Sequence, residues 1–436
     1  MRKLFAFALF ITSIQLLCAQ ALPRRVYLGV KLEDLTDDTR RIMELDIITG
    51  VLVKEVLPQS TAEAAGFKTG DVILTVNDYH PVNSAGLITY LGTQTSGTNF
   101  TYQLFRSKKK INGKAVFKSF PSEKYADIDV TYTEVNTTNG LQRLIITRPK
   151  TAGKLPVVVF IGGIGCYSLD NALDTTKSEQ QILNLITRAG FMCMRIEKPG
   201  MGDNANHCKK CAEVSFNDEL QGYSTAIASI KNRTDVDSNA VFIIGHSMGG
   251  VMAPLIAQQT NIKGIICYGT IGSSFIDYLN KTRRTIAEAY NWKPEETDDY
   301  IKDYCECAGY YFVEKMATAE AAKKNPVCKD YLSIFDYRSR AYNDQLYAIN
   351  IPAAWKPFKG NALFVWGESD YISSKEDHQI LANAVNTYHS GHGSIVTIKN
   401  ADHGMHFATS FAEARTSPGG YNAETGRAML NWLLKQ

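Results

Sequence analysis

The chain has 436 residues, of which 44% are hydrophobic and 21% are charged, and its formal net charge is +3. This composition is ordinary for a folded globular protein, and the length suggests two or three domains. So small a net charge gives no sign of a nucleic-acid partner or of electrostatic binding to a membrane.

The first 21 residues have the three parts of a secretory signal peptide. Met1-Arg2-Lys3 is a positive start, residues 4–17 form a short apolar core, and Ala19-Gln20-Ala21 is a small-x-small exit. We therefore predict an exported protein, periplasmic or extracellular, cleaved after one of these alanines. Cys18 leaves a lipid-anchored alternative open. Neither the apolar core nor any later segment is long enough to be a membrane span.

Residues 22–110 carry several motifs in a fixed order. Tyr27-Leu28-Gly29-Val30 comes first, then Gly50-Val51-Leu52-Val53, then a run from Pro58 to Ile73 with the pattern Pro-x-Ser-x-Ala-x-x-Ala-Gly and Gly-Asp-x-Ile. Strands at 72–76 and 100–106 and a helix at 84–91 are expected after them. These motifs resemble those of the PDZ domains attached to envelope proteases, which implies a small, mainly β domain.

The PDZ resemblance also implies a binding site. PDZ domains add an extended peptide as a strand beside an exposed edge, and a backbone loop captures its terminal carboxylate. Carried over to this chain, that loop consists of Tyr27, Leu28, Gly29 and Val30. A PDZ fold that only packs against its neighbour is the alternative.

Residues 111–436 have the pattern of an α/β sheet. Alternating segments at 128–132 and 144–147 fit antiparallel entry strands, and the apolar run 155–161 fits a parallel strand buried on both faces. Further strands are expected at 191–196, 241–244, 262–268, 362–366 and 394–398, with helices at 179–189 and 219–230 between them. This repetition predicts a doubly wound sheet.

About 90 residues, 271–360, separate two of these strands, which is too long for a simple connection. Of these, 16 are aromatic, compared with 10% for the whole chain. We predict a mostly helical cap inserted over the active site, in which the aromatic residues form at least the core of the cap itself.

The sequence Gly245-His246-Ser247-Met248-Gly249 stands between the predicted strand at 241–244 and a helix-compatible segment. A Gly-x-Ser-x-Gly motif in this position is typical of a nucleophile elbow, a sharp turn that exposes the serine hydroxyl. Glycines suit the turn because side chains would collide there. The sequence therefore predicts Ser247 as a nucleophile.

A serine hydroxyl needs a neighbouring base, and the base needs an acid that orients it. Asp370 and His403 each follow a predicted strand, where open α/β sheets place their sites. The order Ser247, Asp370, His403 is the order found in α/β-hydrolases.

Other histidines and acids compete for these roles. His406 is an alternative base, and Glu368 and Asp377 are alternative acids. We expect His246 to be a structural hydrogen-bond donor. Surface positions are expected for the remaining histidines of this region, His207, His378, His389 and His392.

Two backbone amides are needed to stabilise the oxyanion of the transition state. Met248 follows the nucleophile and supplies one. The second is expected from the loop Gly162-Gly163-Ile164-Gly165, with Ile164 as the donor.

Residues 155–436 thus resemble an α/β-hydrolase of the serine aminopeptidase and esterase group. The loop from Glu197 to Asp203 extends the resemblance, although Asp203 and Asn204 replace the more usual Asp-Ser. Gly162-Gly163 likewise replaces the usual His-Gly. The group acts on esters, peptides and other acyl compounds, so the fold does not define the substrate.

The cysteines allow two interpretations. Cys208-x-x-Cys211 beside His207, together with Cys305-x-Cys307, has spacing that could ligate zinc. Exported proteins more often use such cysteines in disulfides, which we favour, although the sequence does not choose the pairing. Buried thiols are expected at Cys193 and Cys267. We predict no metal site and no cofactor.

Together these features predict a signal peptide (1–21), a PDZ-like domain (22–110) and an α/β-hydrolase domain (111–436). The expected function is an exported serine hydrolase that cleaves a small carboxylic ester through an acyl-enzyme. A serine peptidase with the same triad, whose PDZ domain binds peptide C-termini, is the first alternative. An inactive, peptide-binding envelope adaptor is the second.

Overall fold

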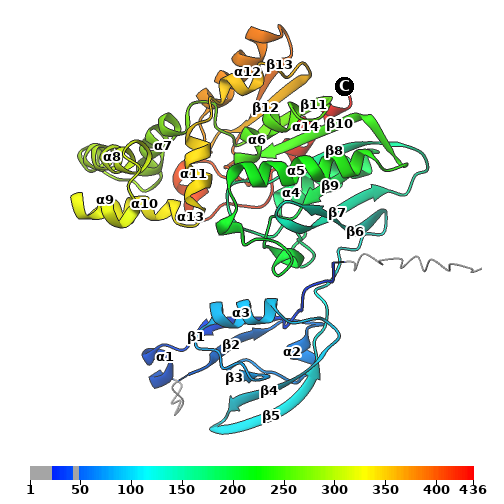
Figure 1. The fold of residues 1–436 in the computed structure, drawn as a ribbon, viewed down its shortest axis with the longest axis vertical. Helices are drawn as coiled ribbons and strands as arrows, with labels where there is room; N and C mark the ends of the chain where they lie inside the picture. Colours follow the sequence, from blue (N-terminus) through cyan, green and yellow to red (C-terminus); the bar gives the residue numbers. More distant parts are fainter. Residues whose placement is uncertain (1–21, 43–48) are drawn as a thin grey trace, which may run out of the picture.

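The computed structural model describes residues 22–42 and 49–436. The predicted signal peptide, its cleavage sites and Cys18 lie outside the described residues. The chain forms two units, a five-stranded sheet near the N-terminus and an eight-stranded sheet after it (Figure 1). Within the described residues, no helix is both long enough and apolar enough to cross a membrane.

The N-terminal unit (residues 26–120) is an antiparallel sheet with three short helices. Ser60 accepts a hydrogen bond from the amide of Glu63 and so caps the second helix, as Asn83 caps the third through Gly86. The sheet order is β1-β2-β3-β4-β5. Its elements are β1 (Val30–Asp34), α1 (Asp37–Ile42), β2 (Val51–Val56), α2 (Thr61–Ala64), β3 (Val72–Val76), α3 (Ser84–Gly92), β4 (Asn99–Arg106) and β5 (Lys109–Val116).

The predicted domain boundary at residue 110 is wrong because it cuts a hairpin. Strand β5 pairs with β4 along its whole length, from Lys109 opposite Arg106 to Val116 opposite Asn99. A bridge between Val26 and Ser119 then closes the unit. Residues 107–114 are mostly polar and show no alternation of apolar and polar side chains, so the sequence gives no sign that a strand begins there.

The C-terminal unit (residues 121–436) is the predicted doubly wound α/β sheet. Its strand order is β13-β12-β11-β10-β8-β9-β7-β6, in which β7 pairs antiparallel with both β6 and β9 and the remaining neighbours pair parallel. The strands are β6 (Ile128–Thr137), β7 (Gly140–Pro149), β8 (Leu155–Ile161), β9 (Met192–Ile196), β10 (Val236–His246), β11 (Gly264–Tyr268), β12 (Asn361–Gly367) and β13 (Gly393–Ile398).

Helices cover both faces of this sheet, which explains why its central strands are apolar throughout (Figure 1). Val157, Val159 and Ile161 of β8 belong to one core, while Val158 and Phe160 belong to the other. The first core is closed by α5 (Phe216–Lys231), α6 (Met248–Ala257) and α12 (Lys375–Tyr388), and the second by α4 (Ser178–Arg188) and α14 (Ala423–Leu433). A short helix, α13 (Phe411–Thr416), precedes α14.

The segment 271–360, which we call the cap, is helical as predicted. It contains α7 (Phe275–Ala289), α8 (Pro294–Ala308), a π-helical turn (Gly309–Val313), α9 (Thr318–Lys324), α10 (Cys328–Leu332) and α11 (Arg340–Tyr347). Its aromatic residues pack on one another, and the rings of Phe275, Phe312 and Phe335 lie 5.1–6.3 Å apart. These aromatics therefore form the core of the cap.

A buried ion network joins Arg24 and Arg25, which lead into the N-terminal unit, to the C-terminal unit. Arg24 lies 2.6 Å from Asp203 and 2.7 Å from Asp170, and the amide of Arg25 donates to Asp203. Arg143 of β7 pairs with the same Asp203. Removing one member would leave an uncompensated buried charge, which costs about 3–5 kcal/mol. Asp203 thus anchors the start of the N-terminal unit to the C-terminal unit.

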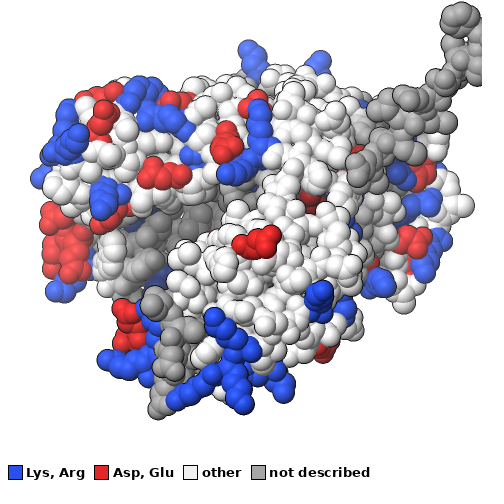
Figure 2. Space-filling model, turned by 60° about the horizontal axis from the view of Figure 1, so that its bottom comes forward, with Lys and Arg blue, Asp and Glu red and all other residues white. Residues whose placement is uncertain are grey.

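Charged residues of both signs lie interspersed on the face viewed from the N-terminal unit (Figure 2). Much of that face carries neither sign, in keeping with the small net charge of the chain.

Candidate active site

Ser247 occupies the sharp turn between β10 and α6. Its backbone has φ 53° and ψ −117°, a strained conformation for a residue other than glycine. A Cβ atom on Gly249 would lie 2.2 Å from the carbonyl oxygen of Ile161, so only glycine fits there. The amide of Ser247 donates to the carbonyl of Tyr268, and Thr270 donates to the carbonyl of Ser247. The turn is therefore held from the neighbouring strand.

His403 and Asp370 form a close pair. The Nδ1 atom of His403 lies 2.9 Å from Oδ2 and 3.1 Å from Oδ1 of Asp370. The carboxylate also accepts hydrogen bonds from Ile372 and Ser373, so that it is fully satisfied although buried.

The two groups shift each other's pKa. Burial favours the neutral form of Asp370, but the His403 imidazole and the Ser373 hydrogen bonds outweigh it and hold the pKa below its ordinary value. Burial also disfavours the imidazolium of His403, but the carboxylate outweighs it and raises the pKa above its ordinary value.

The imidazole of His403 lies next to the turn that holds Ser247. A Cβ atom on Gly269, directly after Tyr268, would lie 3.0 Å from its Nδ1. The His246 ring is 4.9 Å away between ring centroids, and its Nε2 bonds the carbonyl oxygen of His403 at 3.2 Å. Burial and the neighbouring His403 lower the pKa of His246 to about 3, so its neutral ring donates this bond.

The hydroxyl of Ser247 makes no hydrogen bond within the described part of the chain. A link between nucleophile and base that is absent at rest and forms with substrate is common among hydrolytic enzymes.

The loop after β8 lies against the nucleophile. A Cβ atom on Gly163 would approach the Cβ of Ser247 to 3.2 Å. The amide of Gly163 donates to the hydroxyl of Tyr167, whereas the amides of Ile164 and Met248 donate to no acceptor in the described residues. The two amides predicted for the oxyanion hole are thus both unengaged, and the loop that carries one of them touches the nucleophile.

The alternative residues have structural partners elsewhere. His406 pairs with Asp402 at 3.4 Å and with Ser178 of α4 at 3.2 Å. Asp377 accepts from the amides of Gly272 and Ser374, and so caps α12. Glu368 is exposed and accepts from the amide of Asn400.

The expected surface position of His378 is wrong. This residue of α12 is fully buried, where its Nδ1 bonds the carbonyl oxygen of Ser374 and its Nε2 accepts from the amide of Thr270. The burial of His378 could not be predicted, because its partner Thr270 comes from a loop that is distant in the sequence.

Arg338 of the cap, which the sequence did not reveal, also reaches this site. Its Nη1 donates to the carbonyl oxygen of Ile164 at 3.0 Å, and its Nη2 pairs with Glu219. Lys198 pairs with the same carboxylate at 2.9 Å. All three charged side chains are about 1% exposed, so the cap holds the loop that carries a candidate oxyanion donor. A separation of 174 residues leaves no local signal for such a contact.

Comparison with known families places this geometry in context. The family described as "Serine aminopeptidase, S33" matches residues 173–409, more than half of the chain. The chain belongs to this family. A second family, described as "PDZ domain", matches residues 26–115. The protein is therefore an α/β-hydrolase enzyme of the serine aminopeptidase family with an N-terminal PDZ domain.

Individual relatives match shorter stretches. Esterase EstD from Thermotoga maritima is 27% identical over 130 residues, which is 30% of each chain. Periplasmic serine endoprotease DegP from Escherichia coli K12 is 37% identical over 90 residues, 20% of this chain and 19% of DegP. The chain thus spans less than a third of these curated relatives. Carboxyl esterase 2 from Tuber melanosporum has 15% identity and a TM-score of 0.43, with 72% of this chain and 89% of that chain covered.

Two disulfides form in this serine aminopeptidase-family enzyme, Cys166–Cys211 and Cys307–Cys328. Disulfides are thus present, as the sequence favours. The four cysteines at 208, 211, 305 and 307, however, do not pair with one another. Cys211 pairs with Cys166 and Cys307 pairs with Cys328, and both partners come from other segments. Cys208 and Cys305 therefore remain free thiols. The predicted buried thiols Cys193 and Cys267 are confirmed.

We expect removal of the Cys166–Cys211 bridge to destabilise the enzyme. The bridge closes a loop of 45 residues, for which chain entropy predicts a loss of roughly 4 kcal/mol from the free energy of unfolding. Chemical denaturation of a Cys166→Ser, Cys211→Ser double variant measures it. A reductant should lower the melting temperature and a chelator should not. The reverse pattern would favour the alternative interpretation, zinc held by cysteines among 208, 211, 305 and 307.

Proposed function

We propose that the enzyme hydrolyses small carboxylic esters with a Ser247, His403 and Asp370 triad. Ser247 Oγ attacks the ester carbonyl while His403 Nε2 takes the hydroxyl proton. His403 then gives the proton to the leaving alcohol, and water repeats the cycle on the acyl-enzyme. The close pairing of His403 with Asp370 beside the strained Ser247 is the observation that carries this proposal.

The developing negative charge on the ester oxygen needs hydrogen-bond donors already in place. In this proposal they are the free amides of Met248 and Ile164. One such donor is worth about 3–4 kcal/mol of barrier.

Arg338 should therefore matter to the rate as well as to stability. An Arg338→Gln variant loses the charged donor that holds the Ile164 carbonyl, and we expect kcat to fall by roughly 10- to 100-fold with a smaller change in KM. Arg338→Lys should recover part of the loss. The matched control is Arg340→Gln in the same cap, since the partners of Arg340 are Asp344 and the carbonyls of Tyr311 and Met316, all within the cap. Equal kcat values for the two Gln variants would leave Arg338 a purely structural role.

The ester is favoured by the similarity of 130 residues to a protein named an esterase. Turnover of p-nitrophenyl acetate and butyrate, compared with aminoacyl p-nitroanilides, tests it. We expect kcat/KM for the esters to be higher by at least about 100-fold, or roughly 2.7 kcal/mol of transition-state stabilisation. Faster cleavage of the anilides would favour the peptidase.

A serine peptidase with the same triad is the second candidate. The description of the family and the similarity of the PDZ region to periplasmic endoproteases favour it. In this case the PDZ domain would hold a peptide C-terminus at Tyr27, Leu28, Gly29 and Val30. The inactive adaptor is not proposed further, because the chain belongs to a family of hydrolytic enzymes.

We also propose that the mature enzyme works outside the cytoplasm. The leader-like sequence at 1–21, the two disulfides and the periplasmic proteases that share the PDZ region support this location. Fractionation of cells that express the full chain tests it, with cleavage of the leader read by mass spectrometry.

A further inference from the structure

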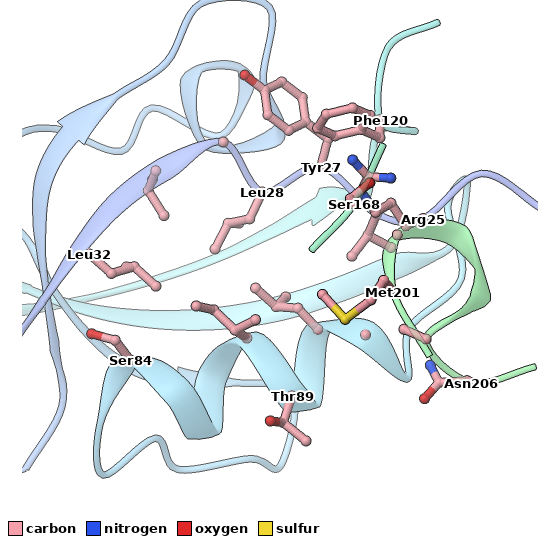
Figure 3. Close-up of a pocket in the computed structure, with 18 of the residues that line it drawn as sticks. Arg25, Tyr27, Leu28, Leu32, Ser84, Thr89, Phe120, Ser168, Met201 and Asn206 are labelled. Atoms are coloured by element: carbon pink, nitrogen blue, oxygen red, sulfur yellow. The ribbon is translucent and has the colours of Figure 1, made fainter. Parts of the chain in front are cut away.

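An apolar groove of about 720 Å³ runs between β1 and α3 of the N-terminal unit and ends against the C-terminal unit. From the N-terminal unit it is lined by apolar side chains that include Leu28, Leu32, Ile88 and Leu91. In Figure 3, Leu28 and Leu32 point into the space beside α3.

The hydrolase side of the groove comes from the loop after β9. Met201, Asn206 and Lys210 line it, as does Ser168 from the segment after the β8 loop. In Figure 3 the side chain of Met201 points from this loop into the space beside α3. A Cβ atom on Gly92, at the end of α3, would lie 3.9 Å from atoms of this loop. The groove is therefore built by both units.

The buried ions described above hold this arrangement. Asp203, two residues after Met201, bonds Arg24 and the amide of Arg25, which stand three and two residues before Tyr27. The position of Met201 relative to the loop is thus fixed by buried charges and not by a flexible linker.

The part of the groove that the Tyr27–Val30 loop lines can receive a carboxylate. The amides of Leu28 and Gly29 donate to no acceptor among the residues described. Gly29 has φ +70°, and a Cβ atom there would collide with Ser60, so the loop requires glycine. Arg25, which also pairs with Asp170, and Lys210, whose nearest carboxylate is that of Glu213 at 3.9 Å, bring positive charge to this end.

Residue 436 lies far from the groove. Gln436 bonds the side chain of Asn361 at the start of β12, and the end of the chain lies on the side of the C-terminal unit away from the PDZ domain (Figure 1).

We infer that the groove is a two-domain site for the C-terminus of another protein, and that Met201 of the hydrolase contacts the last side chain. This rests on the proposed peptide binding by the PDZ domain and adds the hydrolase as a determinant of specificity. Leu28, Leu91 and Met201 make the surface around that side chain apolar, so a large apolar last residue should be selected. Free carboxylate should be required.

Selection from a peptide library with free C-termini, randomised at the last six positions, tests the inference on the full mature chain. We expect enrichment of large apolar residues at the last position. Met201→Asp should instead select Lys and Arg at the last position of the peptide. Its affinity for the peptides that the wild-type chain selects should fall by at least tenfold in anisotropy titrations. Leu173→Asp is the matched control, because Leu173 is exposed on the same unit and does not line the groove.

The outcomes separate two failures. If Met201→Asp selects the same last residue as the wild-type chain and binds the same peptides, the two-domain site is overturned. The PDZ domain would then bind peptides without the hydrolase domain. No enrichment with the wild-type chain would overturn peptide binding itself. A thermal melting curve of each variant reports its folding independently of both proposals.

Discussion

We expect Ser247→Ala to lower ester turnover by roughly 10⁶-fold, the loss typical of a serine nucleophile that works with a base and an acid. The fold should be unchanged, because Ser247 Oγ makes no hydrogen bond within the described residues and its backbone is held by Tyr268 and Thr270. Turnover of a p-nitrophenyl ester and a melting curve on the same sample measure both effects.

A Ser247→Gly variant separates chemistry from backbone strain. Glycine adopts a φ of about 53° readily. The free energy of unfolding of this variant should therefore be roughly 1 kcal/mol larger than that of Ser247→Ala, and its melting temperature should be higher. It should be equally inactive. Turnover by both variants near the wild-type rate would remove Ser247 from the mechanism.

Asp370→Asn should lower kcat by roughly 10⁴-fold, because the amide no longer favours the tautomer and the charge that His403 needs. The pH profile should move as well. Asp370 raises the pKa of His403, and the base acts only when neutral, so wild-type activity falls as pH drops through that raised pKa. In the variant the residual activity should persist to lower pH.

The matched control is Asp377→Asn. Asp377 is buried as well, but its carboxylate accepts from the amide and hydroxyl of Ser374, the N-cap of α12, and from the amide of Gly272, and not from His403. We expect it to cost stability and to change kcat by less than about tenfold, since a capping carboxylate contributes mainly to folding. If Asp377→Asn abolished turnover and Asp370→Asn did not, the acid would be misassigned.

The turn at Ser247 and the strands around it could be predicted because their signals are local. The apolar run of β8 indicates burial on both faces, and the motif around Ser247 combines glycine spacing with a strand and a helix. Asp370 and His403 could be named because each follows a strand of a sheet whose carboxyl ends share one edge. Their pairing agrees with that expectation.

Contacts between distant segments could not be predicted. Arg338 reaches Ile164 from the cap, and Met201 reaches a groove on another domain. His378 and Asp203 looked like ordinary polar residues, yet both are buried with partners from other loops. Such residues are identified by their surroundings and not by their spacing, because a hydrogen-bond partner can come from any part of the chain.

The most direct test of the account is the site at which a fluorophosphonate reacts. This reagent labels a serine that a neighbouring base activates. We predict one labelled peptide in the digest, modified at Ser247, and no labelling in Ser247→Ala. A folded wild-type chain that remains unlabelled, or that is labelled at another serine, would contradict the proposed triad.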